Sequence, residues 1–194
     1  MKKYYKLTDQ NMQTHNGFQW EIGKWIEAKG DISQGLCSDA WLHCYELPLL
    51  AVLHNPIHAN IKNPRLFEVE VDGESKFDSQ LKCGFRRIRL VKEIPLLEIT
   101  TMQKIAYGIL CAKEVYTDKQ WNEWADSWLS EKNKTADAAA YAAVYAAANA
   151  AAHAAAHAAV YAAYAADAAD AAADAAARAI NLNLIDISKK AMKY

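Results

Sequence analysis

RLFEVEVDG, at residues 65–73, alternates apolar and acidic residues and ends in the strongest turn signal of the chain. The alternation has the period of a β-strand whose two faces meet different surroundings. Asp72–Gly73 is a preferred pair for the tight turn of a hairpin. We therefore predict a strand over Arg65–Val71, a turn at Asp72–Gly73 and another strand over Lys82–Val91.

Two further strands are expected nearer the start of the chain. Lys3–Leu7 is the first, and Phe18–Ile26 is the second because Phe18, Trp20 and Ile22 alternate within it. Glycines punctuate the stretches between these strands, which is typical of turns.

Between the second and third predicted strands, Pro48 can open a short leucine-rich helix that ends before Asn55–Pro56. Its leucines are expected in the core. His54 and His58 are four residues apart, but the intervening proline breaks a continuous helix face, so both are predicted in a loop. Residues 1–98 are therefore expected to form a small strand-rich domain of mixed α+β class.

Amphipathic helices should connect this domain to the rest of the chain. Thr100 and Gln103 have the spacing of a capping box, and Thr117–Gln120 repeats the pattern. The second helix carries a tryptophan stripe at i, i+3 and i+7, formed by Trp121, Trp124 and Trp128. The stripe either seals the helix onto the protein or leaves an exposed anchor for a partner.

Residues 136–180 contain 30 alanines and no glycine or proline, which predicts a long helix or a helical hairpin. Alanine faces let another helix approach closely, so larger side chains must supply the specificity of any contact. These side chains recur every three or four residues and form a line that we expect to bind a partner. Its members are Tyr141, Tyr145, His153, His157, Tyr161, Tyr164, Asp167, Asp170 and Asp174.

Composition argues against several classes of protein. The 194 residues carry a net charge of −1, and the one arginine cluster, Arg86, Arg87 and Arg89, would be split between two strand faces, so direct nucleic-acid binding is not expected. No secretory signal or membrane-spanning stretch is visible, so we expect a cytoplasmic protein with no membrane partner.

The four cysteines include no CxxC pair, which favours reduced thiols. A zinc site at Cys37, His43 and Cys44 lacks a fourth ligand, and His153 and His157 lack an acidic companion. We predict no metal and no cofactor.

Four ordered blocks resemble a domain of unknown function that is common in phage and prophage proteins. They are YYKL at 4–7, GFQWEIGK at 17–24, LCSDAWLHCYELPL at 36–49 and FEVEVDGE at 67–74, within roughly the first 95 residues. The chain departs from that pattern at Ala40–Cys44, where a glycine before an aromatic residue and His-Cys is expected. The segment at 122–143 resembles the junction before alanine-rich tails of such proteins. The resemblance implies a viral accessory protein without a demonstrated reaction.

A weaker resemblance, carried by LHCYELPLLAVLH at 42–54, is to the ADP-ribosyltransferase fold. It implies an NAD pocket faced by His43 and Tyr45, with Glu68 or Glu70 stabilising an oxocarbenium-like transition state. The alternative is that His43 is a core histidine and that the glutamates lie on a solvated strand face.

The preferred interpretation is an α+β accessory protein that binds a host protein or protein complex, for example as an inhibitor of a host defence system. An ADP-ribosyltransferase-like enzyme and a self-associating helical protein, forming a homo-oligomer, are the alternatives. The predicted divisions are the domain at 1–98, connecting helices at 99–134, the alanine-rich region at 135–180 and a tail at 181–194. Within that tail, Asn181–Ile187 is expected to form a short strand or clasp.

Overall fold

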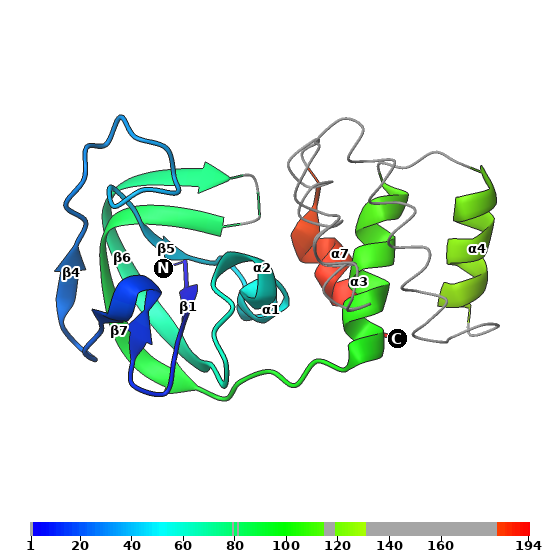
Figure 1. The fold of residues 1–194 in the computed structure, drawn as a ribbon, viewed down its shortest axis with the longest axis horizontal. Helices are drawn as coiled ribbons and strands as arrows, with labels where there is room; N and C mark the ends of the chain where they lie inside the picture. Colours follow the sequence, from blue (N-terminus) through cyan, green and yellow to red (C-terminus); the bar gives the residue numbers. More distant parts are fainter. Residues whose placement is uncertain (1, 79, 81, 115–118, 131–181) are drawn as a thin grey trace. The chain divides into compact units, whose positions relative to one another are not determined.

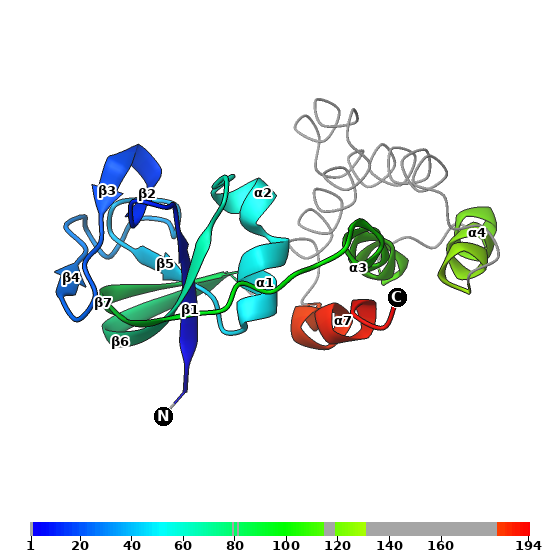
Figure 2. The same cartoon turned by 90° about the horizontal axis from the view of Figure 1, so that it is seen from below.

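The computed structural model describes residues 2–78, 80, 82–114, 119–130 and 182–194. The chain divides into two compact units, residues 1–98 and residues 99–194 (Figures 1 and 2). The first holds an antiparallel sheet and the second holds helices, so the α+β class is confirmed. The long helix or helical hairpin predicted over 136–180 lies outside the described residues. So do the tail residues predicted for partner binding: Tyr141, Tyr145, His153, His157, Tyr161, Tyr164, Asp167, Asp170 and Asp174.

A long antiparallel hairpin forms the centre of the first unit. Its strands are β6 (Arg65–Asp78) and β7 (Lys82–Ile94), which are the long curved strands in Figure 1. Strand β1 (Tyr4–Thr8) pairs with β6, whereas β4 (Trp25–Glu27) and β5 (Leu42–Cys44) both pair with β7. Each of these strand pairs is antiparallel.

The sheet curls back on itself through one further bridge. Tyr5 of β1 and Tyr45, just after β5, exchange two backbone hydrogen bonds of 2.8 Å each. The strands β1, β6, β7 and β5 therefore follow one another around a closed path. Its interior is filled by a cluster of buried side chains: Tyr4, Trp20, Cys44, Phe67, Val69, Cys83, Phe85, Ile88 and Leu90.

The turn predicted at Asp72–Gly73 is wrong. Strand β6 continues through these residues to Asp78, and the register shifts between Asp72 and Ser75. Gly73 has φ of +78°, the left-handed conformation that glycine adopts in β-bulges as well as in hairpin turns. The same residue pair serves both structures, so the local sequence did not distinguish a bulge from a turn.

The single strand predicted over Phe18–Ile26 is also wrong. Strand β3 (Phe18–Gln19) pairs with β2 (Gln13–Thr14) in a separate small sheet, after a 3-10 turn at His15–Gly17 (Figure 2). Gly23, with φ of +82°, then interrupts the extended chain before β4. Trp20 lies in the chain between β3 and β4. Its side chain is 1% exposed and donates the indole N–H to Thr14 Oγ1 at 3.0 Å.

The helix predicted from Pro48 is confirmed as α1 (Pro48–Leu53). The loop predicted after it is wrong, because α2 (Asn55–His58) follows immediately. Proline is tolerated in the first turn of a helix, so Pro56 begins a second helix instead of breaking the chain into a loop. His54 lies at the junction of the two helices.

Three described helices make up the second unit: α3 (Thr101–Lys113), α4 (Lys119–Leu129) and α7 (Leu184–Ala191). The capping box at Thr100 is confirmed, because both of its hydrogen bonds with Gln103 are present, at 3.1 and 3.0 Å. The cap predicted at Thr117 lies outside the described residues. None of the described helices has the length and hydropathy needed to cross a membrane.

The short strand or clasp predicted over Asn181–Ile187 is wrong, because residues 184–191 form helix α7. The side chain of Asn183 accepts the backbone N–H of Asp186 at 3.2 Å, which caps the helix start. Leu184, Ile187 and Ala191 are buried at the spacing of one helix face. The alternation of leucine and asparagine reflected a cap rather than a strand.

Candidate functional site

A half-buried face of the sheet in the first unit combines one tryptophan with two arginines. Trp25 on β4 lies directly opposite Arg89 on β7. The guanidinium carbons of Arg87 and Arg89 lie 5.0 and 4.9 Å from the centroid of the Trp25 ring, which is cation–π distance. We call these three residues, with the acidic residues Glu70 and Asp72 on β6, the Trp25 face.

Ion pairs hold the arginines of the Trp25 face in place. Arg87 Nη1 donates to Asp72 Oδ2 at 2.6 Å, and Arg89 Nη2 pairs with Glu70. The side chains of Arg87 and Arg89 are nevertheless 40% and 34% exposed. Each ion pair uses one nitrogen of a planar guanidinium group that carries donors on all three nitrogens. The face therefore keeps N–H groups that are able to bind a carboxylate or carbonyl of another molecule.

Arg86 points away from the Trp25 face and has a structural role. It donates to the backbone carbonyls of Ala28, Gly30 and Ala40 at 2.7–2.8 Å. The prediction that strand alternation would split the three arginines between two faces is thus confirmed. Sequence reasoning did not select Trp25, because its proximity to Arg87 and Arg89 depends on the pairing of β4 with β7. The arginine pair spaced at i, i+2 was the signal available.

A buried lysine lies inside the first unit. Lys6 is 8% exposed, its Nζ donates to the carbonyl of His43 at 2.7 Å, and the same atom lies 4.5 Å from the centroid of the Trp20 ring. Burial lowers the pKa of Lys6 from 10.5 to about 8. A lysine in this setting is unusual, and its burial could not be read from residue alternation, because strand β1 is buried on both faces.

His43 and Tyr45, the candidates for a nicotinamide pocket, have separate partners. The imidazole Nε2 of His43 donates to the carbonyl of Leu36 at 2.5 Å, and burial lowers the pKa of His43 to about 4. Tyr45 is buried, and its hydroxyl is 2.8 Å from Nδ1 of His58. The rings of His54 and His58 lie 5.1 Å apart beside Tyr45, so α1 and α2 assemble an aromatic cluster there.

Glu68 and Glu70 lie on the opposite side of β6 from the core residues Phe67 and Val69. Glu68 accepts from Lys3 at 3.0 Å and lies 3.5 Å from Lys92, and these cations lower the pKa of its carboxyl group. Glu70 pairs with Arg89. The two glutamates therefore belong to ion pairs on the outer surface of the sheet, with partners different from those of His43 and Tyr45.

The cysteine and histidine side chains considered for zinc do not share contacts either. Cys37 is exposed beside Lys82, with 3.0 Å between Sγ and Nζ, whereas Cys44 is buried against Cys83. Among the described residues, no three histidine, cysteine or acidic side chains converge at metal-binding distance.

The tryptophan stripe of α4 is largely covered. Trp121 and Trp128 are 5% and 0% exposed, and Trp124 is half-buried with its ring 6.2 Å from that of Trp121. Of the two predicted roles of the stripe, this burial favours packing of the helix against the rest of the protein. Trp124 is the member of the stripe with the most surface available to a partner.

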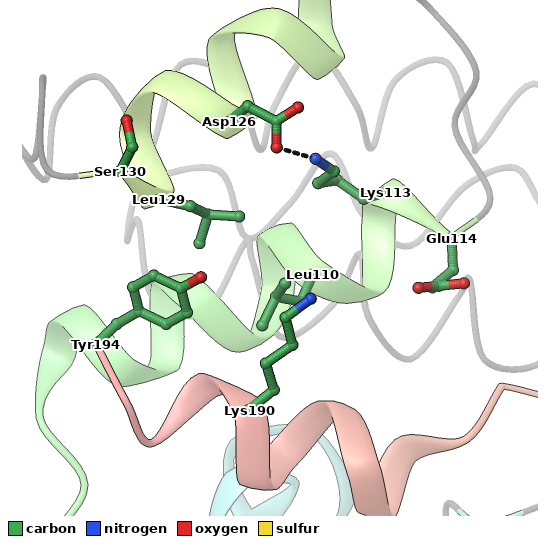
Figure 3. Close-up of a pocket in the computed structure, with 8 residues that line it drawn as sticks. All are labelled: Leu110, Lys113, Glu114, Asp126, Leu129, Ser130, Lys190 and Tyr194. Carbon is green, nitrogen blue, oxygen red and sulfur yellow. Dashed lines mark hydrogen bonds and ion pairs between the residues drawn. The ribbon is translucent and has the colours of Figure 1, made fainter.

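A hollow of about 420 Å³ lies among the three described helices of the second unit (Figure 3). Lys113 of α3 and Asp126 of α4 form an ion pair across it, while Leu110 and Leu129 supply apolar surface. The remaining lining residues are Glu114, Ser130, Lys190 and Tyr194. Its volume falls in the range of small-molecule sites, but its charged groups of both signs define no single ligand chemistry.

Comparison with known proteins gives one family match. The model of a domain of unknown function, DUF7666, matches residues 2–102, which include the Trp25 face and Lys6. No curated protein and no solved structure matches the chain. The prediction of a domain of unknown function over the first part of the chain is confirmed in this form. The chain belongs to the DUF7666 family of domains of unknown function.

Proposed function

We propose that the chain acts by binding another protein, and that the Trp25 face is the contact surface of its N-terminal domain. The observation that carries this proposal is a half-buried sheet face on which the guanidinium carbons of Arg87 and Arg89 both lie within 5.0 Å of the centroid of the Trp25 ring. Tryptophan and arginine are, with tyrosine, the residue types enriched at the energetic centres of protein interfaces.

The physical state of the Trp25 face also favours a contact. Ion pairs with Asp72 and Glu70 restrict the two arginines, so binding would order few additional side-chain rotamers. The two positive and two negative charges balance, which removes the long-range attraction expected of a nucleic-acid site. At the adjoining end of β7, Ile22 bridges to Leu90 and is 52% exposed, and Val91 is 37% exposed, which adds apolar surface.

The specific version of this proposal is a phage- or prophage-encoded accessory protein that binds a host protein, for example a component of a defence system. It is supported by the resemblance of the ordered sequence blocks. The line of tyrosine, histidine and aspartate residues in the tail is a second proposed contact. An enzymatic role has less support, because His43, Tyr45, Glu68 and Glu70 engage separate groups.

Quantitative capture from a bacterial lysate tests the proposal. The full chain and its Trp25→Ala variant would be immobilised at equal density, and retained proteins would be measured by mass spectrometry. Phe77→Ala is the matched control, because Phe77 is also an aromatic residue of the first unit and is 47% exposed.

We expect Trp25→Ala to lose a protein that wild type and Phe77→Ala both retain. Tyr145→Ala and Tyr161→Ala test the tail separately. Equal retention by the Trp25→Ala variant, with its fold verified by near-ultraviolet circular dichroism, would exclude the Trp25 face as the contact.

A further inference from the structure

Two buried thiols face each other across adjacent strands of the first unit. Cys44 on β5 is directly opposite Cys83 on β7 in the antiparallel register, and both side chains are fully buried. Their Sγ atoms are 3.4 Å apart, and the Cys83 thiol also lies 3.2 Å from the carbonyl of Cys44. The proposed protein contact uses neither residue.

This arrangement needs little movement to become a disulfide. Directly opposed residues of antiparallel strands have Cα atoms about 4.5–5.5 Å apart, which lies within the range that disulfides span. The sulfur atoms would have to approach by roughly 1.3 Å to reach the S–S bond length of about 2.05 Å. Side-chain rotation supplies a movement of this size without separating β5 from β7.

We propose that Cys44 and Cys83 form an oxidative modification site, which a small peroxide converts to an intrachain disulfide. In the first step, the thiolate of one cysteine attacks hydrogen peroxide, the O–O bond breaks, and a sulfenic acid and water form after proton transfer. The sulfur of the second cysteine then attacks the sulfenic sulfur. The S–O bond breaks, the S–S bond forms and the thiol proton leaves with the hydroxyl group as a second water.

The surroundings of the thiols favour a small oxidant. Both sulfurs are buried in the core cluster, which excludes glutathione-sized disulfides until the strands open. Burial raises the pKa of the Cys44 thiol, whereas the nearby positive charge of Lys6 acts in the opposite direction. The charge of Lys6 offsets only part of this rise, so the thiolate that starts the reaction is a minor form near neutral pH.

The crosslink would fix the strand that closes the sheet. Strand β5 is followed by Tyr45, which bridges to Tyr5 of β1, so joining β5 to β7 covalently secures both contacts. Cys44 and Cys83 are 39 positions apart, and a loop of this length restricts the unfolded chain substantially. Oxidation should therefore raise the thermal stability of the first unit.

Peptide mapping of the folded full chain after peroxide treatment tests this proposal. The chain is alkylated under denaturing conditions after the reaction, and the linked peptides are identified by mass spectrometry. We expect a Cys44–Cys83 linkage and its reversal by dithiothreitol, and before alkylation the oxidised chain should be lighter than the reduced chain by about 2 Da. The midpoint of thermal unfolding should rise by at least about 5 °C.

Variants separate this site from the other thiols. A Cys37→Ser variant should still form the linkage, because Cys37 is exposed and has a different neighbour, Lys82. Cys83→Ser should lose both the linkage and the thermal shift. Oxidation confined to Cys37, or a Cys44–Cys83 linkage that appears only in denaturant, would overturn the proposal.

Discussion

Replacement of the buried Lys6 by methionine should change how stability depends on pH. Lys6 has a pKa of about 8 in the folded protein, against an ordinary value of 10.5, because burial disfavours the ammonium form. The unfolded chain therefore binds more protons than the folded protein between these two pKa values. The free energy of unfolding of the wild type should accordingly rise with pH across that window. Below pH 8, the destabilisation caused by the buried ammonium group should have its full value.

The size of the effect follows from the two pKa values. Each pKa unit corresponds to about 1.36 kcal/mol, so the buried charge costs the folded state about 3 kcal/mol at pH 7 and about 1 kcal/mol at pH 10. The Lys6→Met variant lacks this contribution. It also loses the hydrogen bond to the carbonyl of His43, which shifts its stability by a similar amount at every pH.

Urea unfolding at intervals from pH 7 to pH 10 is the assay. The free energy of unfolding of wild type minus that of Lys6→Met should increase by about 2 kcal/mol across this range. Lys24→Met, which replaces an exposed lysine, is the control and should show no such trend. If the free energy of unfolding of wild type minus that of Lys6→Met stayed constant from pH 7 to pH 10, this explanation would be refuted, since Lys6 would then titrate as an exposed amine.

Three further predictions concern local structure. The stability of the His43→Gln variant should fall less than that of wild type between pH 6.5 and pH 4. In wild type the folded protein keeps His43 neutral down to about pH 4, so it loses stability as the pH falls through this window. Urea unfolding at both pH values measures the free energies of unfolding. Gly30→Ala should destabilise the first unit by roughly 2 kcal/mol or more, because the added Cβ would lie 2.6 Å from the backbone nitrogen of Ala40. Gly35→Ala is the control, because its Cβ would enter open space, and thermal unfolding compares the two variants. Thr100→Ala should cost about 1 kcal/mol through loss of the α3 cap, and equal stability of this variant would contradict the cap's role.

Elements with a local signal were predictable from the sequence. Alternating residues located β1, β6 and β7, Pro48 located the start of α1, and the spacing of Thr100 and Gln103 located the start of α3. Each of these signals depends on residues within one element. The backbone conformation that they favour is also the conformation that the protein adopts.

Features that depend on distant partners were not predictable. Gly73 is compatible with both a hairpin turn and a β-bulge, and only the pairing of β6 with β7 determines which of the two forms. The burial of Lys6 depends on Trp20, and the Trp25 face depends on the alignment of β4 with β7. The candidate site therefore depends on the register of the sheet, which a single sequence does not supply.

The dissociation constant of the captured partner for three forms of the full chain tests the central proposal most directly. Isothermal titration would compare wild type, Trp25→Ala and the control Phe77→Ala. Truncation of a residue at the centre of an interface costs about 2 kcal/mol or more, so we expect Trp25→Ala to weaken binding by roughly 30-fold and Phe77→Ala to leave it within about twofold. An unchanged dissociation constant for a correctly folded Trp25→Ala variant would contradict a protein contact through this face.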